Sequence, residues 1–218
     1  MTLTIFDLDE TLISTDSDHS WGEYVADKGL VNPEEHRQKN EAFFADYKRG
    51  ALDIDAYMQF SCSVLAQYAM EELECWRNEF FEQRIRPTIL PKALALIGRH
   101  RARGDTLVVV TATIEFITAP IADALGIPNL IAPIPEIRSG RYTGKVVGIP
   151  SYREGKVVRI RQWLKDTGQS LEGSYCYSDS RNDLPMLELA DFPHAVDPDP
   201  ILKDIALARR WPIISLRD

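Results

Sequence analysis

The sequence lacks the features that mark membrane, secreted and nucleic-acid-binding proteins. No apolar run approaches the ~18 residues of a membrane span, and the N-terminal residues lead straight into carboxylates rather than into a signal peptide. Acidic side chains outnumber basic ones by 33 to 25, and the formal charge of −8 disfavours a nucleic-acid backbone as a partner. We therefore expect a cytoplasmic protein with no membrane and no nucleic-acid partner.

Cysteine is also scarce, and its spacing does not suggest a metal site. Cys62, Cys75 and Cys176 form an odd count, without a CxxC pair or a histidine at ligand spacing. We expect three buried, reduced thiols. The remaining composition, 44% hydrophobic and 27% charged over 218 residues, is that of a folded chain with one domain, or with one domain and an insertion.

The periodicity of the apolar residues changes along the chain. Residues 3–7 form a short apolar run typical of a buried strand, and residues 16–86 then have an almost entirely helical pattern. Asn32 before a proline and Asp53 are helix-start signals, and Gly50 is a stop signal. Three helices are predicted within this segment, at 33–49, 53–67 and 70–84.

Beyond residue 87, strands and helices alternate. The β-branched run 106–111 predicts a buried strand, and residues 134–149 predict a hairpin around Ser139-Gly140. The other strands are expected at 130–132, 174–179, 192–196 and 213–216, and the helices at 90–103, 116–125, 156–167, 183–189 and 200–209. The alternation predicts an α/β fold with a doubly wound parallel sheet.

The helical segment interrupts this alternation directly after the first strand. We therefore expect a core of residues 1–15 and 87–218, with residues 16–86 as an inserted helical cap subdomain. Such an insertion would lie over the carboxyl ends of the strands, where doubly wound folds bind their ligands.

Two acidic groups follow predicted strands. Asp7 and Asp9 end the first strand, and alternate residues of an extended chain point to the same side. Asp179 ends a later strand, and Asp183 follows at the start of a helix. Carboxylates that face one another repel unless a cation or a shared proton separates them, and an all-oxygen set suits Mg²⁺. Exposed turn aspartates, and an N-cap role for Asp183, are the alternatives.

Two further signals favour a bound anion. Thr111 ends the β-branched strand, where a hydroxyl and free backbone N–H groups can hold a phosphate oxygen. Lys156 follows Gly155 at a predicted helix start, where a cation is unfavourable against the helix dipole unless it points at an anion. Each signal is weak alone, because strand-end threonines and surface lysines are common.

Together these signals form an ordered set that resembles the haloacid dehalogenase-like superfamily of phosphotransferases over nearly the whole chain. The set comprises DLDET at residues 7–11, Thr111, Gly155-Lys156 and SDSRND at residues 178–183. The helical insertion is similar to the cap of the phosphoserine phosphatase-like branch. The runs at 16–21 and 211–216 resemble a bacterial subgroup whose members are described as histidinol-phosphate or phosphoserine phosphatases.

The resemblance implies a Mg²⁺-dependent phosphate monoester hydrolase that acts through an aspartyl-phosphate intermediate. Asp7 would be the nucleophile, and Asp9 the general acid and then the base. Asp7, the backbone carbonyl of Asp9 and Asp179 would hold the Mg²⁺, with Asp183 orienting its waters. The residues that would hold the transferring phosphoryl group are Thr111, Ala112 and Lys156.

The substrate would be a small phosphorylated metabolite. Residues 111–113 are Thr-Ala-Thr where the phosphoserine enzymes tend to carry Ser-Gly-Gly, which weakens an assignment to phosphoserine. Residues 16–86 hold 15 acidic and 8 basic side chains, so most of the net negative charge lies in the predicted cap. A negative cap favours a substrate with a cationic far end, such as histidinol phosphate, although a solvated acidic surface would give the same count.

The residues that select the substrate would come from the cap and its junction with the core. The candidates are Asp16, Trp21 and Asn182, and Asp18 and His19 lie beside the first two. His19 is more typical of a surface or helix-start position than of a substrate contact, and Trp21 of the core or of the seam between core and cap. The aromatic residues 43, 44 and 47 are interpreted as packing residues.

Two alternative functions are a phosphoserine phosphatase and, from a different class, a phosphorylatable receiver-type signalling switch. Receiver domains also combine aspartates, a threonine or serine and a lysine on a doubly wound sheet. The insertion of residues 16–86 has no place in a compact switch domain. Asp9 would moreover hasten loss of the phosphate that a switch must retain.

Overall fold

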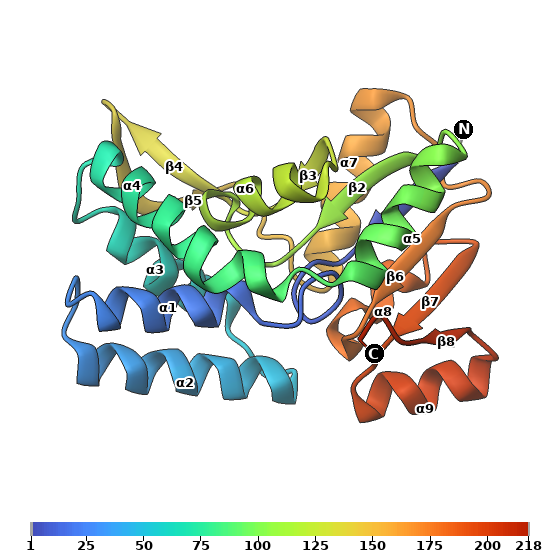
Figure 1. The fold of residues 1–218 in the computed structure, drawn as a ribbon, viewed down its shortest axis with the longest axis horizontal. Helices are drawn as coiled ribbons and strands as arrows, with labels where there is room; N and C mark the ends of the chain where they lie inside the picture. Colours follow the sequence, from blue (N-terminus) through green and yellow to red (C-terminus); the bar gives the residue numbers. More distant parts are fainter. Residues whose placement is uncertain (1, 218) are drawn as a thin grey trace.

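A parallel sheet forms one end of the molecule (Figure 1). The computed structural model describes residues 2–217, in which strands pair in the order β3-β2-β1-β6-β7-β8, each neighbouring pair parallel. The strands are β1 (Leu3–Phe6), β2 (Thr106–Val110), β3 (Asn129–Ile131), β6 (Tyr175–Ser178), β7 (Phe192–Val196) and β8 (Ile213–Ile214). The first strand of the chain therefore lies inside the sheet, with its carboxyl end between those of β2 and β6.

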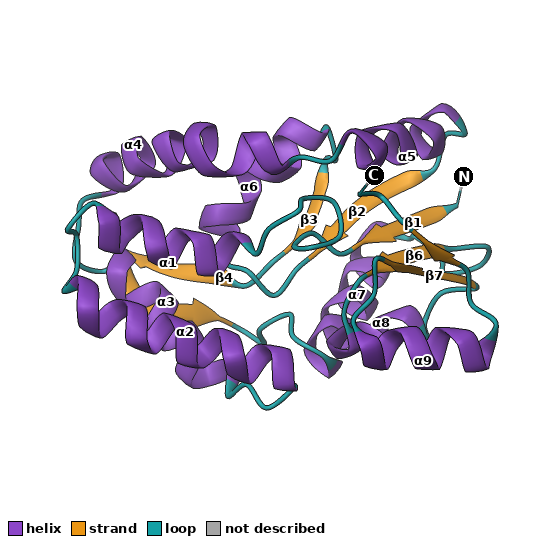
Figure 2. Cartoon of the chain, turned by 60° about the horizontal axis from the view of Figure 1, so that its bottom comes forward, coloured by secondary structure: helices purple, strands orange, loops and turns teal. Residues whose placement is uncertain are grey.

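Helices cover both faces of this sheet, as Figure 2 shows. Because side chains alternate along β1, Leu3 and Ile5 join a core with Ile160 of α7, while Phe6 joins the opposite core with Leu96 of α5. The covering helices are α5 (Pro91–Ala102), α6 (Glu115–Leu125), α7 (Glu154–Thr167), α8 (Leu184–Leu187) and α9 (Pro200–Arg209). The prediction of a doubly wound α/β fold is confirmed.

The segment between β1 and α5 is helical and forms the other end of the molecule (Figure 1). It contains α1 (Ser17–Asp27), α2 (Pro33–Arg49), α3 (Ile54–Leu65), α4 (Met70–Phe80), a π-helical turn (Phe81–Ile85) and a 3₁₀ turn (Arg86–Thr88). The predicted boundary signals are confirmed. Asn32 and Asp53 accept hydrogen bonds from the first turns of α2 and α3, and Gly50 ends α2 at φ +68°.

The predicted hairpin is also present, and it packs on the helical segment. It consists of β4 (Ile134–Arg138) and β5 (Arg141–Val147), which pair antiparallel around a turn with positive φ at Ser139 and Gly140. β5 lies against α3, where the position of a Cβ on Gly144 would be 3.5 Å from the Cβ of Ala66. We propose to keep residues 16–86 as the cap, with this hairpin as a second segment seated on it.

Other local expectations need correction. Cys75 is exposed, whereas Cys62 and Cys176 are buried. Helical phase explains the error, since Leu73 and Phe80 of α4 point inward and Cys75 falls on the other side of the helix. The helix expected at 183–189 is a 3₁₀ turn (Arg181–Asp183) followed by the short α8. Within residues 2–217, no helix combines the length and the apolarity needed to cross a membrane.

Candidate active site

The chain reverses immediately after β1 and so places several polar groups at the edge of the sheet. The Asp7 N–H donates to the Tyr177 carbonyl at 2.9 Å, which extends the pairing of β1 with β6. Leu8 is buried, and its carbonyl accepts hydrogen bonds from the N–H groups of the next turn, including that of Thr11. Glu10 adopts φ +58° to make this turn. The local fold thereby brings Thr11 back beside Asp7.

Thr11 stands between two of the predicted metal ligands. Its Oγ1 lies 3.3 Å from Asp7 Oδ2 and 3.0 Å from Asp179 Oδ1, and it accepts the N–H of Asp179 at 3.0 Å. A single hydroxyl therefore spans the two carboxylates. The carboxyl ends of β1 and β6 meet here, as the sequence predicted.

Lys156 is the cation of this cluster, and it is not a surface residue. Its side chain is 2% exposed, and its Nζ lies 2.7 Å from Asp7 Oδ1 and 2.7 Å from Asp183 Oδ1. Burial alone would lower the pKa of Lys156, but the charges of Asp183 and Asp7 raise it above its ordinary value. A Cβ at Gly155 would lie 2.1 Å from the Pro150 carbonyl oxygen, so only glycine lets α7 begin close enough to deliver Lys156.

Asp183 belongs to the cluster and does not cap a helix. Its side chain makes no capping hydrogen bond to α8. Instead it accepts hydrogen bonds from Lys156 at 2.9 Å and from the Ser178 hydroxyl at 2.8 Å. The side chain of Asp183 therefore does not cap α8 and instead contacts Lys156 and Ser178.

The cluster carries more negative than positive charge. Burial raises the pKa of Asp7 well above its ordinary value, with Lys156 opposing and the other carboxylates adding to the shift. Burial, with the charge of Asp183 next, raises the pKa of Asp179 to about 7. The direction of both shifts indicates that two ionised carboxylates are unfavourable side by side at this edge of the sheet without a further cation.

The donor set suits a hard cation that keeps part of its water shell. Asp7 and Asp179 supply carboxylate oxygens on either side of Thr11, and the backbone carbonyl of Asp9 is two residues beyond Asp7. Among the described residues no group of three or more His, Cys, Asp or Glu side chains is arranged to hold a metal ion. Two carboxylates and a backbone carbonyl would fit Mg²⁺, which keeps several waters, better than a structural zinc.

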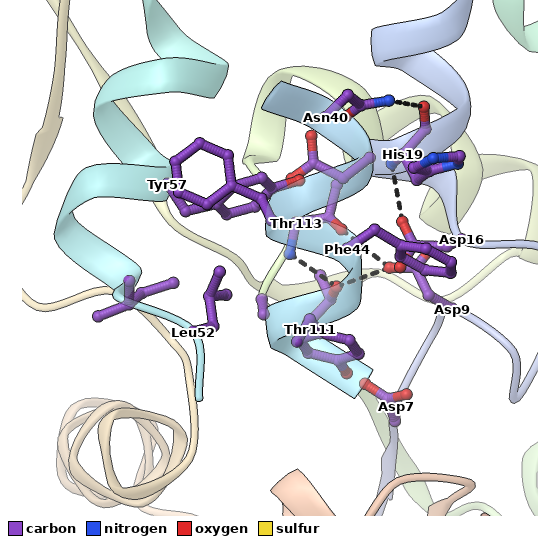
Figure 3. Close-up of a pocket in the computed structure, with 15 residues that line it drawn as sticks. Asp7, Asp9, Asp16, His19, Asn40, Phe44, Leu52, Tyr57, Thr111 and Thr113 are labelled. Carbon is purple, nitrogen blue, oxygen red and sulfur yellow. Dashed lines mark hydrogen bonds between the residues drawn. The ribbon is translucent and has the colours of Figure 1, made fainter. Parts of the chain in front are cut away.

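Asp9 points away from the cluster toward the cap. Its Oδ1 accepts the N–H of Ser17 at 2.7 Å, and its Oδ2 accepts the Thr113 hydroxyl at 2.9 Å and the Thr111 hydroxyl at 3.3 Å. Burial raises the pKa of Asp9 above its ordinary value, against the opposing effect of these hydrogen bonds. Figure 3 shows Asp9 and Thr111 above Asp7 in one pocket.

This pocket lies between the sheet edge and the helical segment (Figure 3). Its free space is about 30 Å³, enough for about two water molecules. The core contributes Asp7, Asp9, Thr111, Ala112 and Thr113. The helical segment contributes Asp16, Asp18, His19, Asn40, Phe43, Phe44, Tyr47, Leu52, Ile54 and Tyr57. The pocket thus brings Asp7, Asp9 and Thr111 together with side chains of the helical segment, whereas Lys156 and Asp179 do not line it.

The predicted cap residues lie in three different places. Asp16 lines the pocket and caps α1 by accepting the N–H of His19 at 2.8 Å. Trp21 does not line this pocket, and instead packs against Phe80 and against Phe116 of the core helix α6. Its position is the seam between core and cap.

Asn182 connects core and cap and does not line the main pocket. Its Nδ2 donates to the Tyr47 carbonyl at 3.0 Å, and its Oδ1 lies 3.4 Å from the Tyr152 hydroxyl. It therefore ties the end of α2 to the loop after β6.

Sequence reasoning missed several residues that line the pocket, including Asn40, Tyr57 and Thr113. The alternation that paired Asp7 with Asp9 also applies to Thr111 and Thr113, so the latter could have been found. Phe43 and Phe44 were interpreted as packing residues, yet both face the pocket. The helical pattern predicts which face of α2 is apolar, but it does not predict whether that face packs on another helix or lines a pocket.

The comparison with known proteins identifies the class. A model of the haloacid dehalogenase-like hydrolases matches residues 4–188. A histidinol-phosphatase of Neisseria meningitidis serogroup C is 45% identical over 219 residues, which cover 99% of each chain. A probable phosphatase of Mycobacterium tuberculosis is 33% identical over 216 residues, which cover 98% of this chain and 75% of that protein.

Solved structures of other proteins share the fold of this chain. A protein of unknown function from Bordetella pertussis Tohama I superimposes with a TM-score of 0.93 at 44% identity, covering 99% of this chain and 100% of that one. A substrate-bound phosphoserine phosphatase superimposes with a TM-score of 0.73 at 21% identity, covering 99% and 93% of the two chains, and shares the fold.

The fold and the acidic site thus define a hydrolase of the phosphatase class. The chain belongs to the haloacid dehalogenase-like hydrolase family. The family resemblance drawn from the four ordered motifs is confirmed, and a receiver-type switch is excluded by this membership.

Proposed function

We propose that this phosphatase is Mg²⁺-dependent and works through an aspartyl-phosphate on Asp7. The observation that carries the proposal is the buried cluster at the carboxyl ends of β1 and β6, where Asp7 is 4% exposed and paired with Lys156. The Asp7 carboxylate attacks phosphorus, and the bond from phosphorus to the substrate oxygen breaks. Asp7, Asp179 and the Asp9 carbonyl would hold Mg²⁺, which would supply positive charge that offsets the charge of the phosphoryl oxygens.

Asp9 is the group placed to move the proton. Its carboxyl faces the pocket and is fixed by Ser17 and Thr113. Burial raises the pKa of Asp9, which favours the protonated form that a general acid needs. It would donate a proton to the leaving alcohol oxygen and then accept one from the water that hydrolyses the aspartyl-phosphate. Lys156 and Thr111 would bind the transferring phosphoryl oxygens.

For the substrate we propose histidinol phosphate. The residues that line the pocket include four aspartates, Asp7, Asp9, Asp16 and Asp18, and neither lysine nor arginine. A phosphorylated amino alcohol with an imidazole ring presents a cation and no carboxylate to such a lining. Phosphoserine carries a carboxylate, for which the lining offers no lysine or arginine. The 45% identity to a protein named histidinol-phosphatase supports the same choice.

The test is an activity screen on purified protein with Mg²⁺, using histidinol phosphate, phosphoserine, sugar phosphates and p-nitrophenyl phosphate. We expect the highest kcat/KM for histidinol phosphate, loss of turnover with EDTA, and recovery on adding Mg²⁺. Asp7→Asn should lower kcat by at least about a thousandfold, because the amide is a poor nucleophile. Undiminished turnover in this variant would refute the mechanism, and preference for phosphoserine or a sugar phosphate would refute the substrate assignment.

A further inference from the structure

One buried carboxyl of the pocket has no part in the chemistry proposed so far. Asp18 of α1 is 6% exposed and lines the pocket from the cap side. Its Oδ1 accepts the Ser61 hydroxyl at 3.2 Å, whereas its Oδ2 is buried without a hydrogen-bond partner. A hydrogen bond from the nearby Tyr57 hydroxyl would lower the pKa of Asp18, but in this structure Oδ2 has no partner within hydrogen-bonding geometry. An unpartnered carboxylate oxygen in a dry site is costly, so a donor is missing.

Two cavities border Asp18, and the main pocket is the roomier source for a donor. Asp18 also borders a second cavity, lined by Trp21, His36 and Asn40, but its free space is about 10 Å³. That is the lower limit for one water molecule, and the main pocket is larger at about 30 Å³. Burial raises the pKa of Asp18 to about 7, and a cationic donor would keep the carboxyl ionised.

The residues around Asp18 indicate which kind of donor group would fit beside it. Asn40 and Tyr57 stand at the end of the pocket away from Asp7 (Figure 3). Phe43 and Tyr57 have ring centroids 5.3 Å apart. His19 and Phe44 face each other at 4.4 Å. Flat rings on the walls and a carboxylate at the end suit a planar nitrogen ring with an N–H group.

We propose that Asp18 is a specificity-determining residue, whose Oδ2 accepts a hydrogen bond from the ring N–H of an imidazole-bearing substrate. The aromatic side chains Phe43, Phe44 and Tyr57 hold the ring against this carboxylate. The inference rests on the proposed function, because it assigns the far end of a substrate whose phosphate lies at Asp7.

The test compares Asp18→Asn with Asp55→Asn, which removes an equal charge from the exposed face of α3. The substrates are histidinol phosphate, ethanolamine phosphate, which has the amine but no ring, and p-nitrophenyl phosphate, which has a ring but no N–H. In Asp18→Asn we expect kcat/KM for histidinol phosphate to fall about ten- to hundredfold. The other two substrates should change less than about twofold. Asp55→Asn should match the wild type on all three.

A second measurement uses the wild-type protein alone. Histidinol should inhibit p-nitrophenyl phosphate hydrolysis at a concentration at least about tenfold lower than ethanolamine does. Equal inhibition by histidinol and ethanolamine would overturn the assignment of Asp18 to the ring. An Asp18→Asn variant that behaves like the wild type would also overturn it. So would an equal loss of kcat/KM on all three substrates, or on histidinol phosphate and ethanolamine phosphate alike. If the wild type hydrolyses none of the three substrates, the proposed function fails. If it hydrolyses p-nitrophenyl phosphate without preferring the imidazole substrate, the substrate assignment fails together with the present inference. If it prefers histidinol phosphate but Asp18→Asn changes all substrates equally, only the present inference fails.

Discussion

Lys156 is held by two carboxylates in a position where a free ammonium would be strongly destabilising. Of these, Asp183 makes two contacts with Nζ and is itself fixed by Ser178. Removing one partner of a buried ion pair leaves an uncompensated charge, whereas an amide keeps part of the hydrogen bonding. The structure therefore makes Asp183 a stability residue as well as a residue of the site.

Asp183→Ala should lower the free energy of unfolding by about 3–5 kcal/mol, and Asp183→Asn by less. Urea denaturation at pH 7 measures both. Asp204→Ala, on the exposed side of α9, is the control and should stay within about 0.5 kcal/mol of the wild type. Equal stability of Asp183→Ala and the wild type would mean that Lys156 is solvated in solution, contrary to its position here.

At the level of single residues, the sequence predicts the site residues that come directly after a strand better than those that a chain reversal or a distant helix brings to the site. Asp7 and Asp179 follow from the strand ends, and their meeting follows from parallel pairing. The bridging position of Thr11 could not be predicted, because it depends on the reversal of the chain after Leu8. Nor does a lone Gly-Lys pair reveal that Lys156 is buried, since that requires the approach of α7 to Pro150.

Among the elements, α5 is fastened to the sheet by a buried polar chain. His100 Nδ1 lies 2.8 Å from Asp105 Oδ2, and its Nε2 lies 2.9 Å from the Tyr177 hydroxyl. Burial lowers the pKa of His100, so the ring is neutral near pH 7. A proton on Nδ1 then lets the ring donate to Asp105 and accept from Tyr177. Thr2 Oγ1 donates to the other Asp105 oxygen at 2.5 Å.

This chain makes part of the stability dependent on pH. Burial opposes the ionisation of Asp105, yet the hydrogen bonds from Thr2 and His100 hold its pKa below the ordinary value. A carboxyl with a lowered folded-state pKa adds stability above its unfolded pKa of about 3.9 and loses it as the pH falls through the folded pKa. Asp105→Asn should therefore lower the free energy of unfolding by about 1–3 kcal/mol at pH 7.

The difference between Asp105→Asn and the wild type should shrink below about pH 4, because the wild-type carboxyl is then protonated as well. Urea titrations at pH 7, 5 and 3 measure it, with the exposed Asp123→Asn on α6 as control. A difference that stays constant down to pH 3 would show that Asp105 contributes no titrating interaction.

Helix boundaries in this chain were predictable where a side chain or a glycine sets them locally. Asn32, Gly50 and Asp53 each act within one turn of their own helix. The seating of the β4–β5 hairpin on α3 could not be predicted, because it joins segments far apart in the sequence. The first cap helix, α1, had no predicted bounds of its own, although Asp16 caps it by accepting the His19 N–H.

Over the whole molecule, the negative charge has two separate origins. Many cap acids form exposed pairs with bases, such as Glu79 with Lys28 and Glu23 with Arg37, and such pairs contribute little to stability. Asp16 and Asp18 instead line the pocket. The acidic residues of the cap therefore fall into two groups, those on the solvent-exposed surface and those that line the pocket. Only the second group can affect which substrate binds.

The small free space of the pocket leads us to expect that the cap and the core move apart before a substrate binds. A free space of about 30 Å³ holds about two waters and is too small for a phosphorylated amino alcohol. The end of α2 is tied to the core by Asn182, which bonds the Tyr47 carbonyl, and by Arg153, whose Nη1 donates to the Gly50 carbonyl at 3.3 Å. These bonds must break on opening and reform on closure, so they bias the equilibrium between the two arrangements.

Asn182→Ala removes one of these ties and should shift the population toward the open arrangement. A net hydrogen bond of about 0.5–1.5 kcal/mol predicts a KM for histidinol phosphate about two- to tenfold higher, because less of the protein is closed around the substrate. Hydrogen exchange in the last turn of α2 should be faster. Asn129→Ala is the control. It removes a hydrogen bond from the side-chain amide to the Leu107 carbonyl, away from the cap, and should leave KM unchanged. Since the tie acts on closure and not on the ring, the rise should be similar for ethanolamine phosphate, and a rise confined to histidinol phosphate would show that Asn182 contacts the substrate instead.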